Sequence, residues 1–160
     1  MTHILRSLPI FSFILMCALS GEVLSQDTDR TPLRLAVAGL THGHVHGLLR
    51  QMDRSDIQIV GIWEPDDEVA RATAARYELP NGLFFSEIGE MLDATQPEAV
   101  AAFNPIAGHL EVVEACAPRG VHVMVEKPLS YSRREARRME HLARQEGIHL
   151  LTNFETTWYA

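Results

Sequence analysis

The sequence predicts an α/β fold, a doubly wound parallel sheet of about six strands. The first observation is a series of short apolar runs after residue 32, continuous enough for strands buried on both faces. The second is that stretches of helical period separate these runs, at lengths typical of the crossovers in right-handed βαβ units. The predicted strands are 33–39, 57–63, 83–85, 99–103, 121–125 and 148–152.

Helix boundaries follow from capping residues between these runs. Asp66 and Ser86 are predicted to cap the helices that follow the second and third strands, since short polar side chains accept bonds from the first amides of a helix. Ser132 and Glu135 have the spacing of a capping box, and Gly147 is placed to end that last helix. The crossovers are therefore predicted to be helical.

Composition indicates one globular domain, assigned to residues 33–153. The chain has 160 residues, of which 46% are hydrophobic and 22% charged, and this length has no room for a two-domain enzyme. The net charge of −7 argues against a nucleic-acid partner. The arginines of 133–144 alternate with glutamates, which is typical of a solvated helix face.

The N-terminal residues are predicted to be a secretory signal peptide, residues 1–25, followed by a polar linker, 26–32. Basic residues precede a twelve-residue apolar run, and small residues follow it. That run is shorter than the roughly 20 residues that span a bilayer. We therefore expect a periplasmic or secreted protein with no membrane attachment after cleavage, whereas translation from Met16 would give a cytoplasmic product. After cleavage Cys116 is the one remaining cysteine, so no intrachain disulfide is expected.

Lys127 is the first candidate for chemistry. It follows a predicted strand directly, and open α/β sheets bind ligands at the carboxyl ends of their strands. Pro128 fixes φ and ends ladder donation, so the chain leaves the sheet there on a stiff corner. Three stretches are expected to converge at the switch point of the sheet: 39–47, 103–109 and 126–128.

The loop after the first strand is an irregular phosphate-binding loop. A dinucleotide fingerprint reads G-x-G-x-x-G, and here Gly39, Thr41 and His44 occupy its three glycine positions, with His42 and Gly43 between the last two. A helix starting near His42 still offers amides and a positive dipole end to an anion. We therefore expect a weakened dinucleotide site.

Glu64 follows the second strand, about 25 positions after Gly39. An acidic side chain near this spacing accepts the ribose hydroxyls of NAD and repels the 2′-phosphate of NADP. The alternative is that Glu64, with Asp66, only opens the next helix near its positive end. In the first case the cofactor is NAD, and NADP is less favoured.

The histidines at alternate positions, His42, His44 and His46, raise the question of a metal. A pair of histidines two apart on a strand can bind one ion, because alternate side chains face one way. The sequence instead places these residues in a turn and a first helical turn, where residues i and i+2 do not face each other. We therefore expect no metal site, and a His-cluster metalloprotein, with hydrolase activity, is the less favoured alternative.

Four segments together resemble the nucleotide-binding domain of the Gfo/Idh/MocA oxidoreductases, which has a Rossmann-like fold. They are LAVAG at 35–39, GIWEPD at 61–66, AFNPIAGHLEVVEAC at 102–116 and GVHVMVEKPLS at 120–130. The last two, in this order, are the specific ones. The resemblance implies that Asn104 and Pro105 line the nucleotide cleft and that Glu126 borders the nicotinamide and substrate. It also implies catalytic roles for Lys127 and for His109, at the start of a helix near the ligand.

Two function classes remain open. In one, the chain is the NAD-binding part of an oxidoreductase acting on a CH–OH group of a sugar or polyol, with Lys127 polarising the oxygen. In the other, it is a non-catalytic nucleotide-binding module or a truncated gene product. The family's enzymes continue into a second α/β domain that binds substrate, so residues 154–160 are expected to begin a truncated C-terminal extension. Self-association or a partner domain is expected at that end.

Overall fold

The computed structural model describes residues 31–154. The predicted signal peptide, most of the linker and residues 155–160 lie outside the described residues. No helix within 31–154 combines the length and apolar character needed to cross a bilayer.

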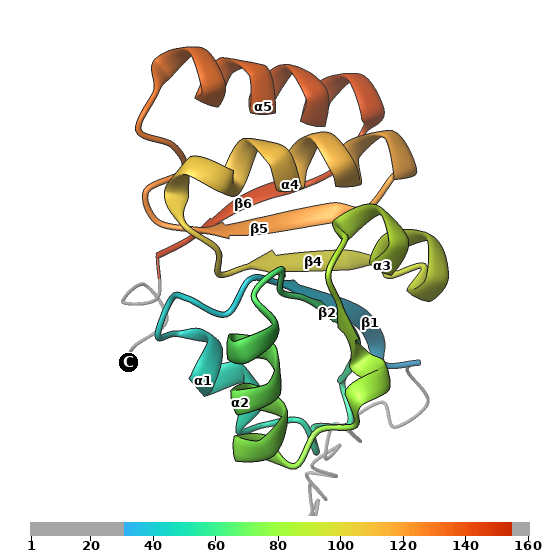
Figure 1. Cartoon of the computed structure of the whole chain (residues 1–160). Helices are drawn as coiled ribbons and strands as arrows, with labels where there is room; N and C mark the ends of the chain where they lie inside the picture. Colours follow the sequence, from blue (N-terminus) through green and yellow to red (C-terminus); the bar gives the residue numbers. More distant parts are fainter. Residues whose placement is uncertain (1–30, 155–160) are drawn as a thin grey trace, which may run out of the picture. The chain divides into compact units, whose positions relative to one another are not determined.

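A six-stranded parallel sheet forms the centre of the fold, with the order β3-β2-β1-β4-β5-β6 (Figure 1). The predicted doubly wound topology is therefore confirmed, and each predicted strand forms, with its ends moved by two residues at most. The strands are β1 (Leu33–Ala38), β2 (Ile57–Trp63), β3 (Phe84–Phe85), β4 (Ala99–Ala102), β5 (His122–Glu126) and β6 (Leu150–Asn153).

Helices α1 and α2 cover one face of the sheet, and α3, α4 and α5 cover the other (Figure 1). The first helix starts later than predicted, at Val45, and is only 5 residues long. Short 3-10 turns cover 81–83, 106–108 and 117–119. The helices are α1 (Val45–Leu49), α2 (Asp67–Tyr77), α3 (Ile88–Thr95), α4 (His109–Cys116) and α5 (Arg133–Glu146).

The predicted caps have different outcomes. Asp66 caps α2 as expected, because its Oδ1 accepts the amides of Glu68 at 2.9 Å and Val69 at 3.2 Å. The prediction for Ser86 is wrong, since Glu87 is the N-cap of α3 and makes no side-chain cap bond. The carbonyl of Ser86, directly after β3, instead accepts the indole N–H of Trp63 at 3.1 Å.

Only one of the two hydrogen bonds of the predicted α5 capping box forms. Ser132 accepts the amide of Glu135 at 3.5 Å, but the Glu135 carboxylate does not return to Ser132. It accepts the Ser130 hydroxyl at 3.0 Å, and the Ser132 amide donates to that hydroxyl at 3.0 Å. Gly147 ends the helix with φ of 69°, as predicted.

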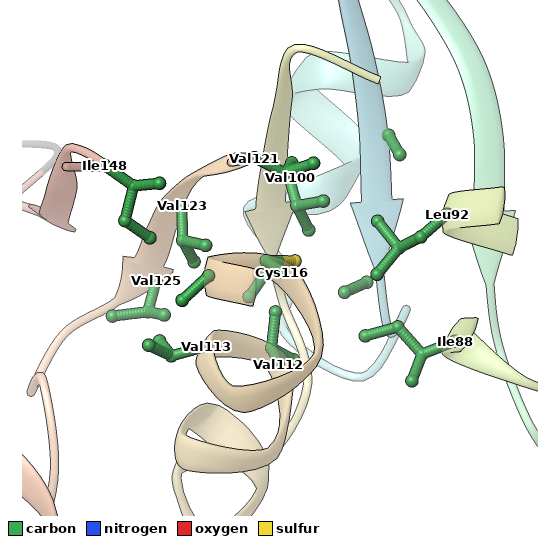
Figure 2. Close-up of a cluster of buried hydrophobic side chains, with 14 of the residues drawn as sticks. Ile88, Leu92, Val100, Val112, Val113, Cys116, Val121, Val123, Val125 and Ile148 are labelled. Carbon is green, nitrogen blue, oxygen red and sulfur yellow. The ribbon is translucent and has the colours of Figure 1, made fainter. Parts of the chain in front are cut away.

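The larger apolar core lies between the sheet and the α3–α5 layer. Figure 2 shows valines of β4, β5 and α4 packed around Cys116, with Ile88 and Leu92 of α3 at one side. A second core, containing Val37, Val45 and Ile62, fills the other face under α1 and α2. Because both faces are covered, the central strands are almost wholly apolar, and polar residues concentrate at the strand ends.

Candidate functional site

The carboxyl edge of the sheet carries two adjoining pockets that share Thr41, Asn104 and Pro105. We call the first, of about 660 Å³, the acidic pocket, because Glu64, Glu87 and Glu111 are among its lining residues. The second, of about 430 Å³, is the lysine pocket, lined also by His42, Ile106, Glu126, Lys127 and Pro128. Chain crossovers leave β1 and β4 toward opposite faces, so this edge is the switch point where doubly wound sheets bind ligands.

Gly39 and Asn104 form the junction of the two pockets. Gly39 has φ of +80°, and a Cβ there would lie 2.5 Å from Cβ of Asn104, so only glycine fits. Asn104 is buried, and its Oδ1 has no hydrogen-bond partner within the described residues. An unpaired buried acceptor between two pockets is a position that a donor group of a bound ligand would satisfy.

The loop between Gly39 and α1 is tied to the end of β4. The Thr41 hydroxyl donates to the Phe103 carbonyl at 3.2 Å, and the His42 amide donates to the same oxygen at 2.9 Å. The His42 amide is thus occupied and does not point at an anion, contrary to the prediction of a helix start there. Gly43 has open space where a side chain would stand, so a ligand can approach its backbone.

Glu64 holds the ends of β1 and β2 together. Its Oε2 accepts the amide of Leu40 at 2.9 Å, and its Oε1 accepts the amide of Asp66 at 3.1 Å. The side chain is 5% exposed and lines the acidic pocket. The carboxylate thus precedes α2, as expected of a residue that opens a helix. It also lines the cleft, as expected of a residue near a ribose.

His42 and His44 meet Glu126 at the end of β5. His44 Nδ1 lies 2.9 Å and His42 Nδ1 lies 3.8 Å from Oε1 of Glu126. The two imidazole rings are in edge contact, with centroids 4.4 Å apart. The expectation that these histidines do not face each other is wrong, because α1 begins only at Val45 and the loop before it has no helical period. His46 points elsewhere, with Nδ1 2.8 Å from the hydroxyl of Tyr77.

The carboxylate of Glu126 is buried and stays ionised more readily than usual. It is 1% exposed, and burial alone would raise its pKa. The hydrogen bond from Asn153 Nδ2, at 2.7 Å, and the contacts with His44 and His42 outweigh burial and lower the pKa below its ordinary range. An anionic oxygen is therefore held beside two imidazoles at the edge of the lysine pocket.

Lys127 occupies the position that its sequence context predicts. It is exposed, lines the lysine pocket with Pro128, and its amide donates to Oε2 of Glu126 at 3.3 Å. The Lys127–Pro128 peptide bond is cis. The amine is thus carried on the chain segment that leaves the sheet, next to Asn104 and Pro105 of the neighbouring strand end.

His109 lies in the interior, away from the two pockets. Its side chain is fully buried, and it does not line either pocket of the cleft. Its Nδ1 lies 3.1 Å from the carbonyl oxygen of Leu129, which can accept a hydrogen bond from it. His109 is the first residue of α4, and its ring reaches the segment after Pro128 and supports it.

Comparison with known proteins identifies the family. Residues 33–154 match the family model described as oxidoreductase family, NAD-binding Rossmann fold, known as Gfo/Idh/MocA. The chain belongs to the Gfo/Idh/MocA oxidoreductase family. As expected of this family, the described residues form a Rossmann nucleotide-binding domain.

Curated relatives are longer proteins. The scyllo-inositol 2-dehydrogenase (NADP(+)) IolU of Bacillus subtilis is 27% identical over 126 residues, which cover 79% of this chain and 38% of that protein. The dTDP-3,4-didehydro-2,6-dideoxy-alpha-D-glucose 3-reductase of Streptomyces antibioticus is 39% identical over 70 residues, 44% of this chain and 21% of that protein. The chain thus spans well under half the length of these relatives.

Solved structures confirm the Rossmann fold. An oxidoreductase from Agrobacterium radiobacter, solved with NAD+, L-tartaric acid and magnesium, superposes with a TM-score of 0.71 at 17% identity, covering 80% of this chain and 37% of that one. The WlbA dehydrogenase from Chromobacterium violaceum, solved with NADH and UDP-GlcNAcA, gives 0.68 at 18% identity, with coverages of 78% and 36%. At this identity the likeness concerns the fold.

Sequence reasoning missed three contributors to the cleft. Asn153 orients Glu126, and Glu87 and Glu111 add negative charge to the acidic pocket. A signal for Asn153 was present, because it ends β6 in register with Glu126 at the end of β5, and the ends of parallel strands share one edge. Glu87 is the N-cap of α3 and Glu111 lies in the first turn of α4, and no local pattern shows that these helix starts lie at this edge.

Proposed function

We propose that the chain binds NAD across the two pockets, in preference to NADP, as the nucleotide-binding part of an oxidoreductase that acts on a hydroxyl-bearing carbon of a sugar or polyol. The family supplies the reaction class. The choice of cofactor rests on one observation, the charge of the acidic pocket. The substrate class is suggested by the relatives, whose names refer to an inositol and a deoxy sugar nucleotide.

The acidic pocket carries three carboxylates, and no lysine or arginine is among its lining residues. In a Rossmann fold the adenosine ribose lies at the end of the second strand, where Glu64 stands here. A 2′-phosphate at that position would meet the negative charges of Glu64, Glu87 and Glu111 without a cation to pair with it. NAD, which has hydroxyls there, avoids this repulsion.

The residues at the junction fit a dinucleotide. Gly39 allows the close approach of backbone and ligand that the turn requires, and the unpaired Oδ1 of Asn104 is an acceptor for a ribose or amide donor. The nicotinamide would then lie in the lysine pocket, which continues from the acidic one through Thr41, Asn104 and Pro105.

NAD supplies a hydride acceptor when bound. The protein's own contribution is Lys127, whose exposed amine reaches the lysine pocket and can donate a hydrogen bond to the substrate oxygen or take up its proton. Glu126 fixes the amide of Lys127 and thereby the start of its side chain. These groups approach the substrate from the sheet edge alone.

Hydride transfer requires that the substrate carbon be held close to the nicotinamide from more than one side. The described residues supply one side of this cleft, and we propose that a second α/β domain, as in the family's longer members, supplies the other. The chain by itself is expected to bind the dinucleotide without turnover. A non-catalytic nucleotide-binding module is the second candidate function, favoured by the same one-sided arrangement.

The test is a calorimetric titration of NAD+ and NADP+ into the unmutated chain, one pocket variant and one control variant. The combined Glu87→Gln and Glu111→Gln variant removes two exposed charges from the acidic pocket, and we expect NADP+ to gain about fivefold in affinity, since such charges contribute about 0.5 kcal/mol each. Glu114→Gln is the matched control, because it removes a charge from α4 outside the pocket, where Glu114 pairs with Arg138. Tighter binding of NADP+ than of NAD+ by the unmutated chain would refute the assignment.

Turnover is tested separately. The chain is incubated with NAD+ and hexoses, inositols or sugar acids, and formation of NADH is followed by absorbance. We expect none, while Lys127→Ala should leave NAD+ affinity nearly unchanged. Rapid NADH formation that Lys127→Ala abolishes would contradict the need for a second domain and would confirm the role of Lys127.

A further inference from the structure

The cluster of His42, His44 and Glu126 has the composition of a metal centre. One potential ligand atom from each residue lies within 4.8 Å of the other two. The residues come from two distant parts of the chain, the loop before α1 and the end of β5, which the parallel sheet brings to one edge. We propose that these three side chains bind one divalent transition-metal ion at the edge of the lysine pocket.

The distances are close to those of a formed site. With metal–nitrogen and metal–oxygen bonds of about 2.0–2.2 Å, two ligand atoms of a tetrahedral site are about 3.4 Å apart. Oxygen Oε1 of Glu126 lies 2.9 Å from His44 Nδ1 and 3.8 Å from His42 Nδ1, on either side of that value. All three ligand atoms lie within 4.8 Å of one another, at most about 1.4 Å beyond that value. Binding an ion would require the two histidine side chains, which lie in the loop before α1, to rotate toward Glu126.

The exposure of the three side chains also suits a metal centre. Both imidazoles are about one-third exposed, at 32% and 30%, whereas Glu126 is 1% exposed. An ion can therefore reach the histidines from solvent and finds a buried carboxylate behind them.

Asn153 provides the outer support that metal ligands usually have. Its Nδ2 donates to Oε1 of Glu126 at 2.7 Å, and the Lys127 amide donates to Oε2 at 3.3 Å. Hydrogen bonds of this kind orient a ligating carboxylate and typically change metal affinity by 10–100-fold. Asn153 is thus a positioning residue for the proposed centre.

The donor set defines the class of metal. Two imidazoles with one carboxylate suit zinc, iron(II) or cobalt(II), while magnesium and calcium prefer oxygen ligands alone. Three protein ligands leave at least one coordination position open, as in catalytic zinc sites. This part of the inference rests on the proposed function: the open position would face the lysine pocket, where it can take a hydroxyl or carbonyl oxygen of the sugar or polyol beside Lys127.

The experiment is a titration of the purified chain, stripped with chelator, with Co²⁺ and with Zn²⁺ in the absence of any dinucleotide. We expect one equivalent to bind, with visible d–d absorption for Co²⁺ that Zn²⁺ displaces. His42→Ala and His44→Ala should each weaken Zn²⁺ binding at least tenfold, and Asn153→Ala about tenfold. Glu126→Gln keeps the shape of the buried side chain and should also weaken binding.

Two histidine variants serve as controls. His46→Ala removes a nearby imidazole, in the first turn of α1, that bonds to Tyr77. His149→Ala removes one of a second ring pair, His122 and His149, at the opposite end of β5. Both should bind Zn²⁺ as the unmutated chain does. Circular dichroism of each metal-free variant establishes that it is folded.

The proposal is overturned if the folded, unmutated chain binds no stoichiometric Zn²⁺ or Co²⁺. It is equally overturned if binding survives the combined His42→Ala and His44→Ala changes, or is lost in His149→Ala. NAD+ titration of the same metal-free samples separates the two proposals, because dinucleotide binding without metal binding leaves the proposed function intact. Metal binding without dinucleotide binding leaves the proposed metal centre intact and contradicts the proposed function.

Discussion

Gly39 is the position where the structure leaves least room for change, and Gly39→Ala is therefore a sharp test of the junction between the two pockets. The new Cβ would lie 2.5 Å from Cβ and 2.6 Å from Cα of Asn104. Because Cα belongs to the backbone at the end of β4, no side-chain rotation can relieve this contact. The φ of +80° adds a second cost for any residue with a Cβ.

The two costs can be added to an order of magnitude. A positive φ costs an L-residue roughly 1–2 kcal/mol, and overpacking of a well-filled site costs typically about 1–3 kcal/mol. We therefore expect Gly39→Ala to lower the free energy of unfolding by about 2–5 kcal/mol. Urea denaturation followed by circular dichroism measures this, with an unchanged m-value as the sign that the comparison is valid.

Gly43→Ala is the matched control within the same loop. A Cβ at Gly43 meets nothing within 4 Å, and its φ is not positive, so the free energy of unfolding should change by less than about 0.5 kcal/mol. The added methyl group should instead weaken NAD+ binding, since this is where backbone and pyrophosphate are expected to approach. A Gly39→Ala variant that unfolds at the urea concentration of the unmutated chain would refute the described contact with Asn104.

Two further predictions concern the rest of the domain. Asp66→Ala should lower the free energy of unfolding by about 1 kcal/mol, because the first amides of α2 lose their acceptor. Asp66→Asn should keep most of the stability of the unmutated chain. Equal stability of the unmutated chain and both variants in urea would contradict the capping role. Burial raises the pKa of the Cys116 thiol from 9.0 to about 12. The unfolded chain therefore loses this proton first as pH rises, so the stability linked to the thiol is full below pH 9 and declines from there through about pH 12. Denaturation between pH 8 and 11 should show a steeper alkaline decline for the unmutated chain than for Cys116→Ala, and parallel declines would argue against a buried thiol.

Sequence patterns located much of the cleft, since the relevant signals act within a few residues. Lys127 and Glu64 line the two pockets because each directly follows a buried strand, and strand ends in a parallel sheet share one edge. Asp66 was identified as a cap because capping bonds span only two or three residues. Ser86 has the same local chemistry, but α3 begins only after Glu87, and a tertiary contact with Trp63 takes the Ser86 carbonyl.

The histidine loop shows where local reasoning failed. His42 and His44 were assigned to a turn and a first helical turn and were expected to face apart, yet their rings touch. The predicted helix started near His42, three positions before the observed start at Val45. The hydrogen bonds that tie this loop to the Phe103 carbonyl leave no pattern in the sequence that would mark it as a loop. His109 was placed near the ligand by resemblance, whereas its burial depends on the path of the segment after Pro128.

The sequence by itself determined the doubly wound sheet, the order of its elements and the strand ends from which the cleft is built, because hydrophobic period and capping are local properties of a chain. Only the tertiary structure decided which polar groups meet. His44 and Glu126 are 82 positions apart and Glu126 and Asn153 are 27 apart, and both contacts depend on strand order and register. The acidic pocket likewise combines carboxylates from the end of β2, the start of α3 and the first turn of α4, so its charge arises from packing across the edge of the sheet.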